Sequence, residues 1–322
     1  MFRLVTAVAV AACVLGGSAS AADDFPSRPI KIVVPFAAGG TADPMARGIA
    51  DIIRQKTNAA VFVESKPGGG GNMGALDVAR ADDGGYTVLL GANNNFVVNQ
   101  FTMPKTSIDP ERDLKLITIL ADQPQVVYVR TDFPVRTMKE LVSYIKEHPG
   151  KVNFASPGVG SAPHLAAELL ADLYDLKMVH IPFRGGAPAV NALLAGDVQL
   201  YMASLSVGKG QVDAGKLRAL AVTAPHRMNS LPDVPTMAEA GFPEYTLSNW
   251  WALAAGKDIP PAHVEWLRHH FIDAVNDPTL KARLEDLGFV IYGSTAKQFE
   301  DRVQKEGTVY RGLVSRRSLA TQ

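Results

Sequence analysis

The sequence predicts an α/β fold with two similar lobes, each built on a largely parallel sheet. Short apolar runs of strand type alternate with segments whose apolar residues recur at helical spacing. The alternation starts near residue 30 and begins again near residue 126. Glycine-rich turns stand between a strand and the next helix at four places. Because strand–helix–strand units build parallel sheets with helices on their faces, these observations together predict the fold class.

The first half contains three strands and two helices. Met45, Ile49 and Ile53 recur at helical spacing and indicate the first helix. Asp43 followed by Pro44 is a strong start for it, since Asp caps free N–H groups and Pro is tolerated at the first helical position. In order, the expected elements are strand 30–34, helix 44–56, strand 61–64, helix 73–81 and strand 86–90.

The second half repeats the pattern. Thr137 and Glu140 form a capping box that opens its first helix. A proline-rich stretch at 231–236 follows its last strand. In order, the expected elements are strand 126–130, helix 137–147, strand 152–155, helix 164–173, strand 178–181, helix 187–194 and strands 198–202 and 217–222.

The C-terminal segment is expected to return to the first half. Its helices have too few residues for a core of their own, so they must pack on something already built. In order, the expected elements are strand 250–254 and helices 261–276, 278–287 and 295–313.

This return makes the first lobe discontinuous. We expect residues 22–123 plus 250–322 to form one lobe and residues 124–249 the other. The crossings near 122–126 and 248–251 would then act as a hinge beside a cleft. Two α/β lobes around a cleft are typical of solute-binding proteins that close by hinge motion.

The N-terminus predicts export. Arg3 precedes an apolar run at 4–15, and Ala19-Ser20-Ala21 has the form of a secretory cleavage site. The run is shorter than the roughly 20 residues that a membrane-spanning helix needs. We therefore expect residues 1–21 to be a signal peptide that is removed, together with the lone Cys13.

Composition excludes several kinds of partner and site. The 322 residues include 32 Lys and Arg against 32 Asp and Glu, so the chain lacks the basic field that nucleic acid or an anionic membrane surface requires. A single cysteine allows neither an internal disulfide nor a Cys-rich metal site. After loss of residues 1–21, 31 basic and 32 acidic residues remain. We expect a monomer without bound nucleic acid.

The four glycine-rich turns, at 39–40, 68–71, 158–160 and 185–186, each follow a strand and open a helix. Ligands of open parallel sheets bind at the carboxyl ends of strands. A helix N-terminus offers free N–H donors and a partial positive charge, so it binds anions without Lys or Arg. Convergence of two such turns, one from each half, predicts a trap for a small carboxylate. Tight turns that need glycine for geometry alone are the competing explanation.

Motifs for other chemistries are absent or incomplete. Residues 69–74 match G-x-G-x-x-G, but the next strand ends at 90–94 without the acidic residue that a dinucleotide site needs. The sequence has no P-loop, no G-x-S-x-G and no H-E-x-x-H. Ser161 near His164 is interpreted as a helix cap rather than as a nucleophile pair. We place His263, His269 and His270 on a polar helix face without a metal, and we expect no cofactor.

Three other features have two readings each. The amides of Asn93, Asn94 and Asn95 follow a strand end and either point into the cleft or form a plain loop. Arg184 either pairs with a second carboxylate of the ligand or is a solvated charge. The adjacent Trp250 and Trp251 face opposite ways on a strand, so one is core and the other lines the cleft or hinge.

Seven segments together resemble one family, the substrate-binding proteins of tripartite tricarboxylate transporters, also called the Bug family. The resemblance runs from about residue 25 to the last helix and is far more specific than any single glycine motif. The segments are IKIVVPFAAGGTADPMAR (30–47), VESKPGGGGNMGA (63–75), DGGYTVLLG (83–91), FASPGVGSAPHLAAELL (154–170), VHIPFRGGAPAVNALLAGDVQL (179–200), GKLRALAVTAPHR (215–227) and LPDVPTMAEAG (231–241).

This resemblance implies a two-lobed periplasmic binding protein, type II-like, that has no catalytic activity. It implies a small organic carboxylate held between two strand–loop–helix turns and passed to membrane transporter subunits or to a sensor kinase. It also implies which residues bind: Phe36, Ala38, Gly40, Thr41 and Asp43 in the first turn, Ser156, Gly158, Gly160, Ser161 and His164 in the second, with Asn72, Asn94, Phe183 and Arg184 as additions.

The sequence departs from the family at two places. Met202-Ala203 stands where members often have Phe-Asp, which makes an amino-acid ligand a poorer fit, and residues 208–210 read Gly-Lys-Gly. The alternative function is a secreted α/β enzyme that acts on a small acid through Ser161, His164 or Asp43. The absence of a nucleophile motif favours the binding protein, and the sequence does not name the carboxylate.

Overall fold

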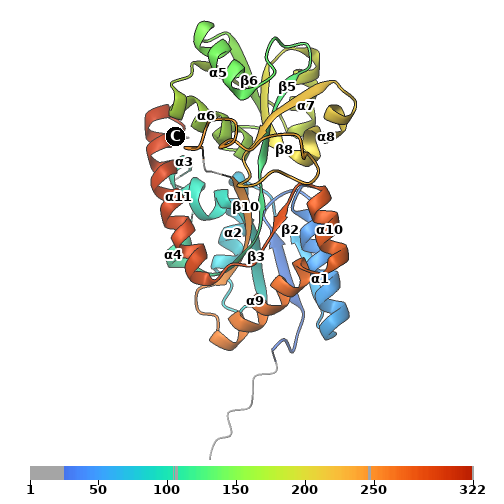
Figure 1. Cartoon of the computed structure of the whole chain (residues 1–322). Coiled ribbons are helices and arrows are strands. Elements are labelled where there is room, and N and C mark those ends of the chain that lie inside the picture. The colour runs from blue at the N-terminus through green and yellow to red at the C-terminus, as the bar shows by residue number, and fades with distance from the viewer. Residues whose placement is uncertain (1–24, 104, 106–107, 246–247, 321–322) are drawn as a thin grey trace, which may run out of the picture.

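The chain is described by a computed structural model that covers residues 25–103, 105, 108–245 and 248–320. The expected signal peptide, residues 1–21, lies outside the described residues. Two sheets, one above the other in Figure 1, form the centres of two lobes. The first lobe is defined here by the six-stranded sheet and the second lobe by the five-stranded one.

The first-lobe sheet has the strand order β11-β4-β10-β3-β1-β2. The parallel trio β2-β1-β3 comes from the predicted strand–helix alternation, whereas β10, β4 and β11 join antiparallel. The strands are β1 (Ile30–Val34), β2 (Val61–Ser65), β3 (Thr87–Ala92), β4 (Leu114–Gln123), β10 (Asn249–Gly256) and β11 (Val290–Ile291).

Helices cover both faces of this sheet because its strands are buried on both sides. Ile32 and Val34 of β1 point into one apolar cluster and Val33 into another, as alternation along a strand requires. The helices and helical turns are α1 (Asp43–Thr57), η1 (Gly69–Gly71), α2 (Asn72–Ala79), η2 (Asn94–Val98), α3 (Asn99–Thr102), α4 (Pro110–Asp113), α9 (Pro261–Val275), α10 (Pro278–Asp286) and α11 (Ala296–Arg317).

The second-lobe sheet has the order β7-β6-β8-β5-β9, with β6 parallel to both neighbours and β5 antiparallel to both of its own. Its strands are β5 (Gln125–Arg130), β6 (Val152–Ser156), β7 (Met178–Pro182), β8 (Leu200–Ser204) and β9 (Leu217–Val222). Its helices are α5 (Met138–Glu147), α6 (Ala162–Tyr174), α7 (Gly186–Ala195) and α8 (Leu205–Asp213).

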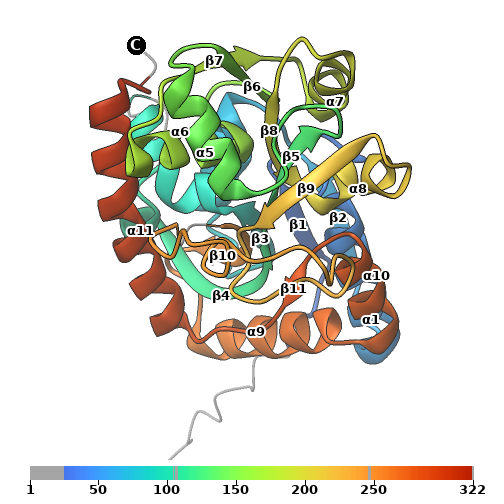
Figure 2. The ribbon, with the colours of Figure 1, turned by 45° about the horizontal axis from the view of Figure 1, so that its top comes forward.

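The chain passes between the lobes at two neighbouring places. Pro124 alone separates β4 from β5, and β10 begins at Asn249, where it pairs with Gln123 at the end of β4. The C-terminal helices pack on the first half as expected, with α9 and α10 against α1. Helix α11 also reaches the second lobe, running along the side of the molecule past α6 (Figures 1 and 2).

Several elements were missed and two expectations need correction. Strands β4 and β11, helices α4 and α8 and the helical turns at 94–102 were not predicted. Thr137 caps α5 by accepting from the Glu140 N–H, but the Glu140 carboxylate accepts from the Arg136 N–H, so the reciprocal bond of a capping box is missing. His263 is 4% exposed and stacks on Phe25, so it does not lie on a polar face.

No helix among the described residues is long and apolar enough to cross a membrane.

Candidate ligand cleft

A cavity of about 460 Å³ lies between the two lobes beside the chain crossings. The turns before α1, α6 and α7 and the ends of β3, β5, β8 and β10 form its walls. The described residues that line it include no Lys, Arg, Asp or Glu. The lining residues are Phe36, Ala37, Gly40, Thr41, Ala42, Ala92, Asn93, Asn94, Gln123, Gln125, Pro157, Ser161, Ala162, Pro163, Gly185, Gly186, Tyr201, Ala203, Ser204, Val207, Asn249 and Trp251.

The first wall is the turn that leads into α1. Gly39 has φ +76°, a left-handed conformation that glycine adopts without strain. The predicted cap is wrong in detail: Asp43 is the first helical residue and no side chain caps this end. The Asp43 carboxylate instead accepts from Arg47 at 2.9 Å, and this hydrogen bond lowers the pKa of Asp43. The N-terminal N–H groups of α1 therefore stay free of side-chain caps at the cleft.

The opposite wall is the turn between β6 and α6, which needs glycine at two left-handed positions. Gly158 has φ +137° and Gly160 has φ +76°. Ser161 occupies the cap position, but its hydroxyl donates to the Gly158 carbonyl at 2.6 Å and makes no capping bond. The interpretation of Ser161 as a side-chain cap is therefore wrong. Ala162 and Pro163, the first two residues of α6, line the cleft.

His164 supports this turn from behind. Its side chain is almost fully buried, and its Nδ1 accepts from the Gly160 N–H at 3.1 Å. The His180 ring stacks on it at 3.9 Å and also contacts the Ser156 hydroxyl through Nε2 at 2.6 Å. Burial, with a smaller contribution from His180, lowers the pKa of His164 to about 3. The imidazole is therefore neutral at ordinary pH and available as an acceptor.

The other two glycine turns differ from each other. Asn94 lines the cleft and donates to the Gly70 carbonyl at 2.6 Å, whereas Asn72 is buried and accepts from Asn99. At the fourth turn, Gly185 and Gly186 line the cleft at the start of α7. The N-termini of α1, α6 and α7 thus meet around one uncharged cavity.

Some of the predicted ligand-binding residues line the cleft, and the others lie outside the lining. Those in the lining are Phe36, Gly40, Thr41, Asn94 and Ser161. Those outside the lining are Ala38, Asp43, Asn72, Ser156, Gly158, Gly160, His164, Phe183 and Arg184. Among the latter, Phe183 packs against the apolar core of the second lobe and Arg184 is exposed.

The strand crossings contribute lining residues that sequence reasoning missed. Gln123, Gln125 and Asn249 flank the two crossings and line the cleft. The expectation for the two tryptophans is confirmed: Trp250 is fully buried in the core and Trp251 lines the cleft. The sequence did carry a signal for these three amides, because each stands directly beside a predicted crossing between the lobes.

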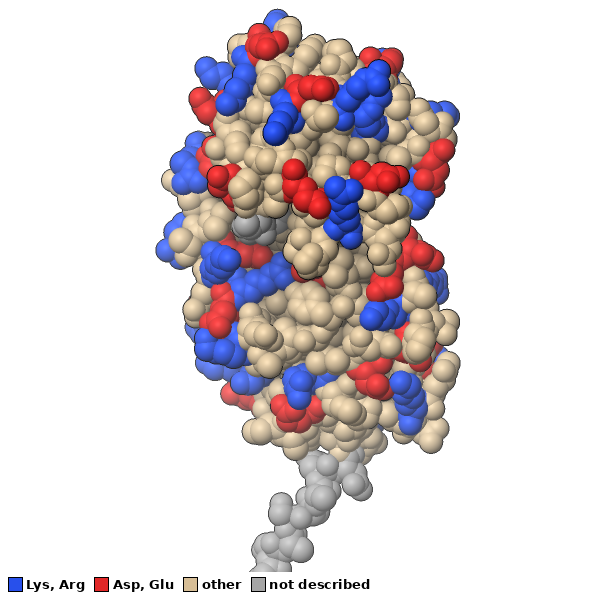
Figure 3. All heavy atoms as spheres, viewed as in Figure 1, with Lys and Arg blue, Asp and Glu red and all other residues tan. Residues whose placement is uncertain are grey.

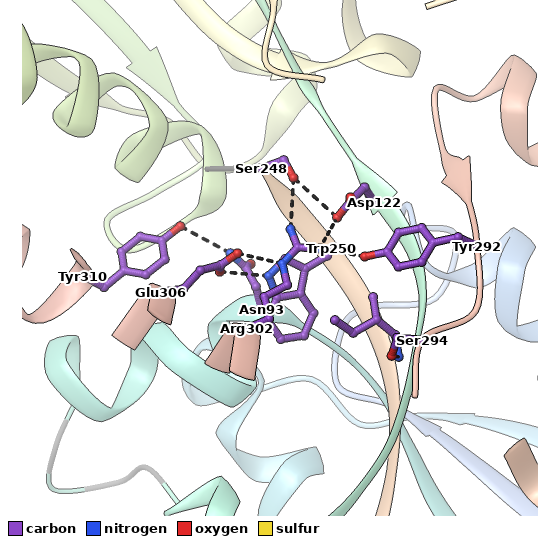
Figure 4. Close-up of polar contacts among 10 residues, drawn as sticks. Asn93, Asp122, Ser248, Trp250, Tyr292, Ser294, Arg302, Glu306 and Tyr310 are labelled. Atoms are coloured by element: carbon purple, nitrogen blue, oxygen red, sulfur yellow. Dashed lines mark hydrogen bonds and ion pairs between the residues drawn. The ribbon is translucent and has the colours of Figure 1, made fainter. Parts of the chain in front are cut away.

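A polar network lies on α11 at the same crossings (Figure 4). The Arg302 guanidinium binds Asp122 at 2.8 Å, Glu306 at 2.8 Å and the Tyr292 hydroxyl at 2.7 Å. It also donates to the Ser248 hydroxyl at 3.3 Å. Asp122 and Ser248 stand on the two crossings, so a single side chain of α11 holds both.

The surface outside the cleft carries charges of both signs. Figure 3 shows Lys and Arg interspersed with Asp and Glu over the face in view. No group of three or more His, Cys, Asp or Glu side chains within the described residues is placed to hold a metal ion. At the cleft, the described residues offer partial positive charge through the N-termini of α1, α6 and α7.

Two α/β lobes, joined by two adjacent crossings around a ligand-sized cleft, define a solute-binding protein of the two-lobed periplasmic type. Residues 45–319 match the model of the tripartite tricarboxylate transporter family receptor, and the chain belongs to this family. The periplasmic binding protein BugD superposes with a TM-score of 0.77 at 32% identity, over 92% of this chain and 100% of BugD.

Two relatives have been solved with carboxylates. An R. palustris protein with adipate gives a TM-score of 0.80 at 28% identity, over 91% of this chain and 98% of that one. MatC from Rhodopseudomonas palustris with bound malate gives a TM-score of 0.77 at 29% identity, over 90% of this chain and 100% of MatC. The family and these neighbours are periplasmic binding proteins and not enzymes.

Proposed function

We propose that this protein captures a small organic carboxylate in the cleft between its lobes. The observation that carries the proposal is the meeting of three helix N-termini around a cavity whose lining has no charged side chain. Backbone N–H groups at helix N-termini bind anions, and their strength grows where water is excluded. The lining residues Phe36, Gly40, Thr41, Asn94 and Ser161 contact the ligand, and the residues behind them hold the turns in shape.

The relatives solved with adipate and malate support this ligand class. Members of the family are periplasmic binding proteins, so the site of action is the periplasm. Export through removal of residues 1–21, action as a monomer, and delivery of the ligand to membrane subunits of a tripartite transporter or to a sensor kinase are parts of this proposal.

Ligand capture requires the lobes to move. We assign residues 22–123 plus 250–322 to one rigid body and residues 124–249 to the other. The hinge lies at the two crossings, where Pro124 and the start of β10 stand side by side. Closure about these two points brings the turn before α6 toward the turn before α1.

The geometry disfavours the alternative enzyme. The Ser161 hydroxyl donates to the Gly158 carbonyl, and the His164 Nδ1 is occupied by the Gly160 N–H, so the two side chains do not form a nucleophile–base pair. The Asp43 carboxylate is bound to Arg47.

A thermal-shift screen of mono-, di- and tricarboxylates tests the proposal. A ligand that binds only the folded state at 100 times its Kd stabilises that state by about 2.7 kcal/mol, which is readily seen as a raised Tm. We expect at least one acid to raise Tm and to bind with one-to-one stoichiometry by calorimetry, without product on prolonged incubation. Failure of every acid to raise Tm would contradict the proposal.

A further inference from the structure

Two glutamines flank Pro124, the one residue between β4 and β5, and both line the cleft. Gln123 is 2% exposed and Gln125 is 4% exposed. Each has one side-chain polar atom that is buried and has no hydrogen-bond partner. Buried polar groups in folded proteins are nearly always paired, so two unpaired ones in a ligand cleft require an explanation.

The orientation of the Gln123 amide is fixed by its partners. Its Oε1 accepts from the Trp251 indole Nε1 at 3.2 Å and from the Asn249 Nδ2 at 3.2 Å. An indole N–H only donates, so the atom facing it must be the oxygen and the amide cannot be flipped. The unpaired atom of Gln123 is therefore the donor Nε2.

The Gln125 amide is fixed by the opposite logic. Its Nε2 donates to the Gln123 backbone carbonyl at 3.3 Å. A carbonyl only accepts, so the atom facing it must be the nitrogen. The unpaired atom of Gln125 is therefore the acceptor Oε1. Its own backbone N–H donates to Thr223 at 2.8 Å, which anchors this residue in the second lobe.

Two lining residues, two positions apart, thus hold one unpaired donor and one unpaired acceptor, both buried in this state. A carboxylate, an ether or a ketone offers only acceptors, and an ammonium group offers only donors. A hydroxyl both donates and accepts, so it satisfies both atoms at once. The lack of any charged lining residue also disfavours an ammonium group on the ligand, since nothing in the lining would neutralise it.

We propose that the ligand is a hydroxycarboxylate whose hydroxyl accepts from Gln123 Nε2 and donates to Gln125 Oε1, while its carboxylate lies at the helix N-termini. This inference rests on the proposed function and narrows its ligand class. Gln123 is tied to the first lobe through Trp251 and Asn249, and Gln125 to the second through Thr223. Both atoms are buried in this state, so the inference requires that the proposed lobe closure at Pro124 bring them to the ligand. One hydroxyl then bridges the two lobes.

Affinities for matched pairs of acids test the inference. The pairs are malate and succinate, citrate and tricarballylate, and lactate and propionate, which differ only by a hydroxyl. In at least one pair we expect the wild type to bind the hydroxylated acid tenfold or more tightly, because the acid without it leaves both amides unpaired. In Gln125→Met, which keeps the side-chain length and removes the acceptor, we expect that preference to fall below threefold.

Gln100→Met is the matched control, since the Gln100 amide donates to the Phe96 carbonyl within the first lobe and Gln100 is not among the residues that line the cleft. It should keep the wild-type preference. An equal loss of affinity for both members of a pair in Gln125→Met would mean a purely structural role and overturn the inference. Wild-type binding of carboxylates without a hydroxyl preference would overturn it while leaving the proposed function intact. If none of these acids nor adipate binds, the proposed function fails and the inference falls with it.

Discussion

Arg302 on α11 binds Asp122 at the end of β4 at 2.8 Å, and so ties the C-terminal helix to a chain crossing between the lobes. The same guanidinium reaches Ser248 next to the other crossing and Glu306 one turn along α11. Glu306 in turn accepts from the buried Trp250 indole at 2.9 Å. Burial raises the pKa of both Asp122 and Glu306 even though Arg302 opposes it. The two chain crossings are therefore braced by a buried ionic network.

Arg302→Gln should destabilise the protein by about 3–5 kcal/mol near neutral pH, because two buried carboxylates lose their cation. The pH dependence has a definite sign. The pKa values of both carboxyls are higher in the folded state than in the unfolded chain. Their ionisation therefore lowers the free energy of unfolding as pH rises, and their protonation restores it as pH falls. The difference in free energy of unfolding between Arg302→Gln and wild type, measured by chemical unfolding, should therefore be smaller at pH 5 than at pH 8. A deficit that grows on acidification would contradict this account.

Lys297→Gln is the control for that experiment. Lys297 also lies on α11 and pairs with a carboxylate, that of Asp301 one turn along the helix, but the two side chains are 75% and 55% exposed. Exposed ion pairs contribute little to stability. We expect almost no change in the free energy of unfolding for this variant. A loss of stability equal to that of Arg302→Gln would show that removal of any charge from α11 has the same effect.

Ser161→Asp should weaken carboxylate binding at least tenfold. The new carboxylate would stand in the cleft lining at the start of α6 and repel the ligand from the same N–H groups. Ser161→Asn has the same size without the charge and should change affinity less than threefold. Calorimetric titration with whichever acid the screen identifies measures both. Equal effects of the two variants would point to a steric cause and away from an anion at this helix end.

Gly160→Val should reduce ligand affinity strongly while leaving most of the fold intact. A β-branched residue is strained at φ +76°, so the turn before α6 must reshape. Gly150 has a similar φ of +72° in an exposed turn away from the cleft, which makes Gly150→Val the matched control. Both variants should lose stability to a similar degree, and only the first should lose binding. Wild-type affinity in Gly160→Val would contradict a role of this turn in the site.

The sequence predicts the turns of the cleft well because glycine and proline act locally. Gly39, Gly158 and Gly160 stand at left-handed positions that few other residues adopt, so spacing alone locates the strand–helix junctions. Strand β4 escaped prediction for the opposite reason. It pairs with β10, whose residues lie more than 100 positions later, and long-range antiparallel pairing leaves no local periodic signal.

The direction of a side chain is likewise set by distant contacts. Ser161 and His164 both look like lining residues from their place in the turn, yet only Ser161 lines the cleft, and His164 is buried behind the turn against His180. Gln123 joins the cleft only because Trp251 and Asn249 return beside it after more than 120 residues. Sequence reasoning therefore predicts the backbone framework of the cleft and misses the amides at the chain crossings.

His164 should make the protein acid-sensitive in a defined pH range. Its pKa is lowered to about 3 in the folded state, against about 6.5 in an unfolded chain. A depressed pKa gives stability that is present above 6.5 and is lost as pH falls toward 3, at up to roughly 1.4 kcal/mol per pH unit. His164→Asn keeps a side-chain acceptor for the Gly160 N–H and does not titrate in this range. Chemical unfolding from pH 7 to pH 4 should therefore show a shallower loss of stability for His164→Asn than for wild type. Identical slopes would mean that the ring takes up its proton equally in the folded and unfolded states, and that it is not held as a neutral acceptor for the Gly160 N–H.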